Sequence, residues 1–196
     1  IDLNPPTDPI AGVQYTTADV RNTAGMEAAF ADADAVVHTA AALPSYPADT
    51  IRSIIVDGTQ SVLTAARARR VGRVVHISST AVYGLPSLVP TPETYPRKPV
   101  DAYSAAKAGA EEVCERFRAE GLCVAMLRPK TFLGPGRMGL FAMLFEWAEE
   151  GHNFPILGTG EVRIQMFAVE DLVSTVLGML HVPADIANDT YNVAAA

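Results

Sequence analysis

Tyr103 and Lys107 lie four residues apart in the stretch DAYSAAKAGAEE, which spans residues 101–112. In a helix, this spacing places both side chains on one face, one turn apart. A tyrosine hydroxyl titrates near pH ~10, but a neighbouring ammonium stabilises its phenolate. The pair therefore has the chemistry of a proton-transfer site in which Lys107 tunes Tyr103. The plainer alternative is a tyrosine ring that covers the core and a lysine that sits in water.

Short β-branched runs alternate with longer alanine-rich segments, and these elements must position the pair. Residues 33–41, 72–79 and 122–129 are each typical of a buried strand. Helical spacing of apolar residues covers roughly 50–71 and the segment that follows Asp101, a candidate helix cap. Alternating strands and helices predict an α/β protein with a doubly wound parallel sheet covered on both faces.

The carboxyl ends of parallel strands open on one edge of the sheet, where ligands bind. The segments HTAA, HISST and RPKTF follow the three predicted strands, so we expect them to meet there. The proline-rich loop 84–100 is long enough to border such a site. Composition changes near residue 134, which predicts a larger part, residues 1–133, interleaved with a smaller lobe, residues 134–196.

Composition favours a cytoplasmic globular protein. Of the 196 residues, 49% are hydrophobic, and the formal net charge is -7, which argues against binding to nucleic acid. No apolar run reaches the ~20 residues that span a bilayer, so we expect no membrane association. Cys114 and Cys123 form no metal-binding pattern and are expected to be reduced thiols. His38 and His76 end apolar runs and are interpreted as strand-end residues, so no metal site is expected.

Three motifs occur in a fixed order. They are SSTAVYG (78–84), YSAAK (103–107) and LRPKTFLGPG (127–136), with DAVVHTAA upstream and FAVEDLV downstream. Together they resemble the extended short-chain dehydrogenase/reductase superfamily, and within it the NAD-dependent epimerase/dehydratase family, over nearly the whole chain. The resemblance implies a Rossmann-type fold in which residues 1–133 bind NAD and residues 134–196 form a substrate-side lobe.

The resemblance also implies roles for the motif residues. Tyr103 would be the catalytic base, Lys107 would tune it and bind the nicotinamide ribose, and Ser79 would orient the substrate oxygen. Ser78 and Thr80 are adjacent alternatives to Ser79, which would otherwise only cap a strand. The residues implied in substrate binding are Ser79, Thr80, Thr131 and Arg163.

NAD is the cofactor that the resemblance implies. Asp2 matches the acidic residue that binds the adenosine ribose, and a carboxylate there favours NAD because it repels the 2′-phosphate of NADP. Small side chains after the strand at 33–41 would let the backbone pass close to the dinucleotide. The further residues implied in cofactor binding are Asp19, Val20, Thr39, Ala40, Ala41, Tyr103, Lys107, Pro129 and Thr131.

The sequence departs from the family at several positions. It has no GxxGxxG loop, so we expect a piece of a longer protein that lacks the first βα unit; the alternative is a relative that no longer binds NAD. Ile55 and Thr131 stand where the family often has asparagine. Thr80 and Ala81 stand where 4,6-dehydratases have acidic residues, which argues against that reaction.

These expectations combine into one functional hypothesis with two alternatives. The leading hypothesis is an NAD-dependent epimerase or dehydrogenase that acts on a hydroxyl-bearing carbon, with a nucleotide sugar as substrate. The alternatives are a ketone or hydroxysteroid-type reductase of the same superfamily and a noncatalytic NAD-binding protein. The resemblance also implies a homodimer formed through two helices per subunit, and the alanine-rich helix with Tyr103 is a candidate for one of them.

Overall fold

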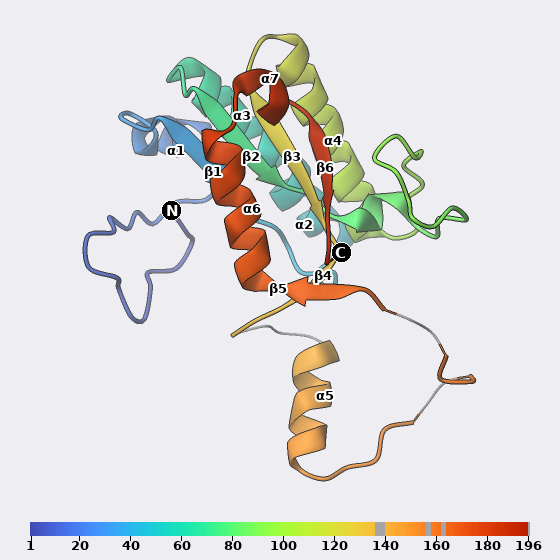
Figure 1. The fold of residues 1–196 in the computed structure, drawn as a ribbon. Helices are drawn as coiled ribbons and strands as arrows, with labels where there is room; N and C mark the ends of the chain where they lie inside the picture. Colours follow the sequence, from blue (N-terminus) through green and yellow to red (C-terminus); the bar gives the residue numbers. More distant parts are fainter. Residues whose placement is uncertain (136–139, 156–157, 162–163, 196) are drawn as a thin grey trace.

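The computed structural model describes residues 1–135, 140–155, 158–161 and 164–195 (Figure 1). In these ranges, the main sheet has four strands, all parallel, in the order β1-β2-β3-β6. The β-branched and apolar residues of the strands suit burial on both faces. The strands are β1 (Ala35–His38), β2 (Arg73–Ile77), β3 (Val124–Pro129) and β6 (Thr190–Val193).

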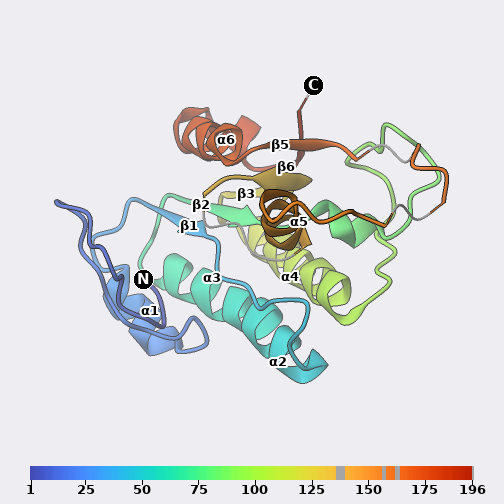
Figure 2. The ribbon, with the colours of Figure 1, turned by 90° about the horizontal axis from the view of Figure 1, so that it is seen from below.

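Helices cover both faces of this sheet, which confirms the predicted α/β doubly wound architecture (Figures 1 and 2). On one face lie α1 (Thr23–Ala29), α3 (Gly58–Ala68) and α4 (Ala102–Ala119), and on the other lies α6 (Val169–His181). The short α7 (Ala184–Ala187) precedes β6. Each face has its own core: Val74 and Val124 pack toward α3 and α4, whereas Val75 and Ala125 pack toward α6.

Helix α4 begins at a capping box. The carboxylate of Asp101 accepts a hydrogen bond from Ser104 N at 2.7 Å, and Ser104 Oγ accepts one from Asp101 N at 3.1 Å. These two bonds satisfy backbone donors that the first helical turn cannot pair. The cap confirms the predicted helix start and fixes the first turn, which carries Tyr103.

A continuous helical segment runs before α4 in the chain and packs against it. It consists of α2 (Ala48–Arg52), a π-helical turn η1 (Ser53–Asp57) and α3, so it begins near the predicted residue 50 and ends before the predicted residue 71. Ile51 and Ile55 pack against Ala106 and Ala110 of α4. Small side chains of α4, Ala106 and Ala110, therefore face this segment and let the two helices pack closely.

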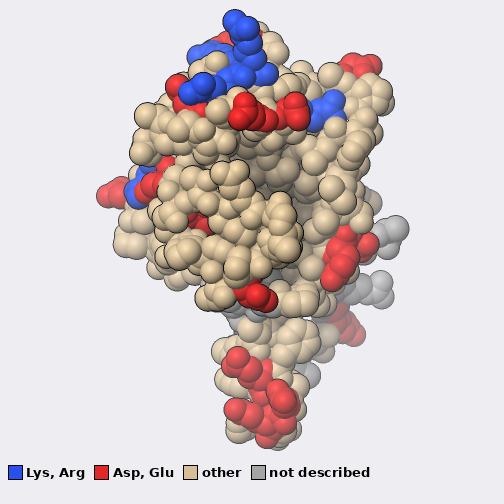
Figure 3. Space-filling model, turned by 90° about the vertical axis from the view of Figure 1, so that its left-hand side faces the viewer, with Lys and Arg blue, Asp and Glu red and all other residues tan. Residues whose placement is uncertain are grey.

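A second, two-stranded parallel sheet follows the end of β3. It pairs β4 (Thr131–Leu133) with β5 (Met166–Ala168), and Phe132 and Phe167 meet edge to face within it. Helix α5 (Leu140–Glu149) projects away from the main sheet (Figure 1), and acidic side chains gather on this projecting end of the molecule (Figure 3). The division of the chain at residue 134 stays a prediction, although β6 lies in the main sheet.

The first residues of the chain pair with the segment around Thr17 through a parallel β-bridge. Asp2 bridges Thr17, and Ala18 N donates to Asp2 O at 3.0 Å. Among the strands within the described ranges, β1 pairs only with β2. Whether a further βα unit belongs beside β1 stays a prediction.

Candidate functional site

The three segments that follow β1, β2 and β3 meet at one cavity of about 510 Å³, as the strand pattern predicts. Tyr103 and Lys107 line it from α4. Apolar walls come from Leu43, Pro44, Ile77 and Phe132, which the sequence reasoning did not identify. The predicted site residues that line this cavity are Thr39, Ala41, Ser79, Thr80, Tyr103, Lys107, Pro129 and Thr131.

Lys107 is buried at the cavity, with only 3% of its surface exposed. Its Nζ donates to Ile77 O at 2.8 Å, at the end of β2, and lies 5.9 Å from the centroid of the Tyr103 ring. Burial lowers the pKa of the ammonium to about 8, although the nearby Glu111 carboxylate acts in the opposite direction. The lysine therefore does not sit in water, and its charge lies where it can act on Tyr103.

Ser79 is the best placed of the three adjacent hydroxyls to orient a substrate. Ser78 Oγ is buried and donates to Glu111 at 2.6 Å, and Thr80 Oγ1 donates to Pro129 O at 3.4 Å. Ser79 Oγ instead accepts from Ala81 N at 3.1 Å, which caps the 3-10 turn η2 (Thr80–Tyr83). An oxygen that accepts in this way keeps its own hydrogen for donation. Its substrate role stays a prediction.

A buried ion pair lies directly behind the cavity wall, and the sequence reasoning missed it. Glu111, which is 0% exposed, accepts from Arg128 Nε at 2.8 Å and from Arg128 Nη2 at 2.7 Å. Burial opposes ionisation of Glu111, but the hydrogen bonds from Arg128 and Ser78 outweigh it, so the pKa of the carboxyl is lowered. The sequence does contain a signal for the position of Glu111. It follows Lys107 by the same four residues that separate Lys107 from Tyr103, so all three side chains lie on one face of the helix.

The loop 84–100 reaches the cavity through Gly84. This residue has φ +64°, and a Cβ there would lie 2.1 Å from Lys98 O. The same close approach allows Lys98 N to donate to Val82 O at 2.9 Å. Only glycine accommodates both the backbone conformation and the contact, so the loop closes against the cavity at this position.

The other described residues that are predicted to bind NAD do not line this cavity. Asp2 is exposed and accepts from Asn4 N, whereas the Asp19 carboxylate accepts from Arg21 Nε at 2.9 Å, and the hydrogen bonds from Arg21 lower its pKa. Val20 and Ala40 line a neighbouring hollow beside β1. Arg163 lies outside the described residues. The cofactor and substrate roles of all these positions stay predictions.

His38 and His76 lie side by side on β1 and β2, with ring centroids 5.2 Å apart. Burial lowers the pKa of His38 to about 3 and holds that of His76 well below its usual value, so both rings are neutral at pH 7. His38 Nε2 pairs with Thr59 Oγ1 at 3.0 Å. Across the described ranges, no group of three or more His, Cys, Asp or Glu side chains is arranged to hold a metal ion.

No helix in the described part of the chain combines the length and the apolar character needed to cross a membrane.

Comparison with known proteins gives a consistent result. A sequence model of the NAD dependent epimerase/dehydratase family matches residues 4–194. The protein y4nG of Sinorhizobium fredii is 32% identical over 100% of this chain, and 3beta-hydroxysteroid-dehydrogenase/decarboxylase isoform 2 of Arabidopsis thaliana is 33% identical over 82% of it. The structure of the dTDP-glucose 4,6-dehydratase DesIV from Streptomyces venezuelae, with NAD bound, has a TM-score of 0.83 at 27% identity over 95% of this chain.

The chain spans only part of each of these proteins. It covers 49% of y4nG, 29% of the Arabidopsis protein and 60% of the DesIV chain. The likeness to DesIV identifies the fold as Rossmann-type.

Proposed function

Because the chain belongs to the NAD-dependent epimerase/dehydratase family, we propose that it forms part of an NAD-dependent enzyme that oxidises a hydroxyl-bearing carbon of a nucleotide sugar, as an epimerase or a dehydrogenase. The observation that carries this proposal is the buried Lys107 beside Tyr103 at the cavity that Ser79 also lines. The likeness to DesIV, which binds NAD, supports the cofactor and the substrate class.

The residues at the cavity are compatible with NAD. Thr39 and Ala41 leave room for a dinucleotide to approach the end of β1. An ammonium has three N–H donors, and Lys107 directs one of them to Ile77 O, so others can reach a ribose hydroxyl. When bound, NAD supplies the acceptor for the hydride that leaves the substrate carbon.

The side chains then handle the proton. Tyr103, as the phenolate, accepts the proton of the substrate hydroxyl, and the charge of Lys107 stabilises that phenolate. Ser79 donates its hydroxyl hydrogen to the substrate oxygen and so orients it. Thr80, Thr131 and Arg163 are proposed to bind the rest of the substrate.

A second candidate is the oxidation of an alcohol on an apolar molecule such as a steroid. The apolar cavity walls, Leu43, Pro44 and Phe132, favour this candidate, as does the likeness to the Arabidopsis hydroxysteroid dehydrogenase. Thr131, which stands where the sequence resemblance expects asparagine, is consistent with a weaker hold on a diphosphate.

One experiment separates these functions. NAD binding to the intact natural protein is measured by calorimetry, and UDP-sugars, dTDP-sugars and hydroxysteroids are then screened for turnover. Epimerised sugar without net NADH supports an epimerase, and NADH formed from a sugar supports a dehydrogenase. NADH formed only from steroids favours the second candidate. Tight NAD binding with no turnover of any substrate contradicts both and supports a noncatalytic NAD-binding protein.

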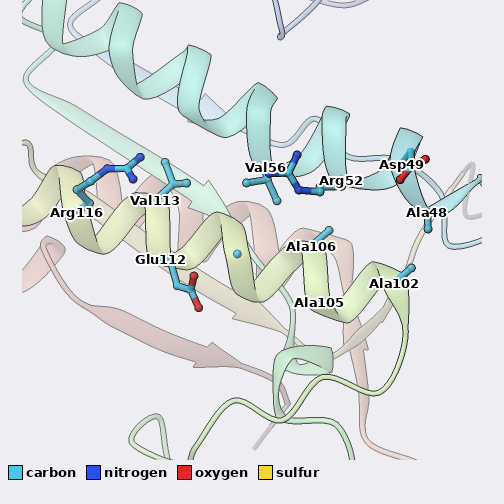
Figure 4. A pocket seen from close by; sticks show the side chains of 11 residues that line it. Ala48, Asp49, Arg52, Val56, Ala102, Ala105, Ala106, Glu112, Val113 and Arg116 are labelled. Carbon is cyan, nitrogen blue, oxygen red and sulfur yellow. The ribbon is translucent and has the colours of Figure 1, made fainter.

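A groove between α4 and the segment formed by α2 and η1 supports the further proposal of a homodimer. The groove measures about 590 Å³, and small side chains on its α4 side, Ala102 and Ala105, leave the helix surface open (Figure 4). Its rim carries two acidic and two basic side chains, so the surface can pair with itself around a two-fold axis. The rim residues are Asp49, Arg52, Glu112 and Arg116.

We expect Ala105→Arg to convert the dimer to a monomer. Ala105 is exposed on the groove side of α4, so a long charged side chain there would separate two packed helices without disturbing the core. Light scattering coupled to size-exclusion chromatography measures the mass. Ala119→Arg, also exposed on α4 but outside the groove, should leave the dimer intact. A dimer that persists in Ala105→Arg would place the interface elsewhere.

A further inference from the structure

Two successive turns of α4 hold two successive residues at the end of β2. Lys107 Nζ donates to Ile77 O at 2.8 Å, and one turn later the Glu111 carboxylate accepts from Ser78 Oγ at 2.6 Å. The next residue in the chain is Ser79. Glu111 and Lys107 therefore both tie the end of β2, next to Ser79, to the helix that carries Tyr103.

The same carboxylate also holds the far wall of the cavity. Arg128, whose guanidinium pairs with Glu111 through two hydrogen bonds, is followed in the chain by Pro129, which lines the cavity. Arg128 Nη1 extends the contact to Tyr83 OH at 2.6 Å and to Glu93 O at 2.9 Å. One buried anion thus joins α4, the ends of β2 and β3, and the loop 84–100.

Arg97 of the loop 84–100 is a second cation that pairs with Glu111. Arg97 Nη1 donates to Glu111 Oε2 at 3.2 Å and to Glu115 Oε1 at 2.9 Å. The Glu111 side chain is fully buried, whereas that of Glu115 is 47% exposed. Hydrogen bonds to a buried carboxylate constrain geometry more strongly than those to an exposed one, because an unpaired buried charge is strongly unfavourable.

We propose that Glu111 is a positioning residue of the reaction, which acts through Ser78 to hold Ser79 at the distance from Tyr103 that proton transfer requires. This inference rests on the proposed function of Tyr103 and Ser79. Glu111 does not line the cavity, so its effect is on the alignment of the reacting groups and not on binding. A displacement of a reacting group by about 1 Å lowers a rate by about 100-fold.

The test compares Ser78→Ala, Glu111→Gln and the control Glu115→Gln in the intact natural protein. Turnover on the substrate found in the screen is expressed per bound NAD, which removes any loss of folded protein from the comparison. We expect kcat per NAD site to fall about 10-fold in Ser78→Ala and about 100-fold in Glu111→Gln, with KM little changed. Glu115→Gln should stay within about two-fold of the wild type, because it removes only an exposed pair.

A second readout does not depend on activity. Amide hydrogen exchange over residues 79–84 should be faster in Ser78→Ala and unchanged in Glu115→Gln. If Glu111→Gln fails to fold, Ser78→Ala decides, since it leaves the Glu111–Arg128 pair intact. Unchanged kcat per NAD site in Ser78→Ala overturns the inference. If no substrate turns over in the wild type, the proposed function fails, and unchanged exchange at 79–84 then overturns the positioning role separately.

Discussion

Replacing Tyr103 by phenylalanine should lower kcat by about 10²–10⁴-fold while NAD remains bound. The substitution removes only the hydroxyl, and the ring keeps its partly buried place against Ile55 and Ala106. The substrate hydroxyl then has no base to accept its proton, so hydride transfer must proceed without proton transfer to the protein. Turnover of the intact natural protein and its NAD affinity by calorimetry are measured side by side.

Tyr191→Phe is the matched control for this prediction. Its hydroxyl donates to Ile186 O at α7, and Tyr191 does not line the cavity. We expect its turnover to match that of the wild type. Full activity in Tyr103→Phe would contradict the assignment of Tyr103 as the base, whatever the substrate.

Replacing Lys107 by methionine should lower kcat by about 100-fold or more, because the phenolate of Tyr103 loses the charge that stabilises it. In the wild type, the same dependence should appear as a fall in turnover above pH about 8, where Lys107 loses its proton. A pH–rate profile of both proteins is the measurement. An alkaline fall near pH 8 that persists in Lys107→Met would assign this titration to another group.

The pKa of Lys107 also predicts how stability changes with pH. Burial lowers this pKa from 10.5 to about 8, so between these values the unfolded chain binds the proton and the folded chain does not. The contribution of Lys107 to the free energy of unfolding therefore rises as the pH is raised through this window, by about 1–3 kcal/mol. Chemical denaturation at about pH 7.5 and at about pH 10 gives the difference.

Lys107→Met should lack this rise because methionine does not titrate. The difference in unfolding free energy between wild type and variant isolates the contribution of Lys107 from that of the other titratable groups. Equal pH slopes in the two proteins would show that the lysine is not held in a low-polarity environment.

The elements at the site were predictable because their signals are local. The run of β-branched residues before His76 and the cap at Asp101 lie within a few residues of the structures they specify. The meeting of Ser79, Tyr103 and Pro129 followed from the parallel sheet, since its strands all end at one edge.

The network behind the cavity was not predictable in the same way. Glu111 and Arg128 come from different elements. Their pairing depends on which residue of α4 lies over Arg128 of β3, and this is set by the tertiary packing of the helix on the sheet. From the pattern alone, Glu111 beside Glu112 reads as part of a solvated helix face. In the structure the two residues have different environments: Glu111 is buried against the sheet, whereas Glu112 is exposed at the groove.

The π-helical turn at Ser53–Asp57 changes which side of one long helix its residues face. A π turn contains one extra residue, and one residue corresponds to a rotation of about 100° around a helix axis. Before the turn, Ile51 faces α4, and after it, Val62 and Leu63 face the strands. Deleting a single residue from this turn would rotate one half of the helix relative to the other, so the number of residues in 53–57 is constrained as well as the type of the buried Ile55.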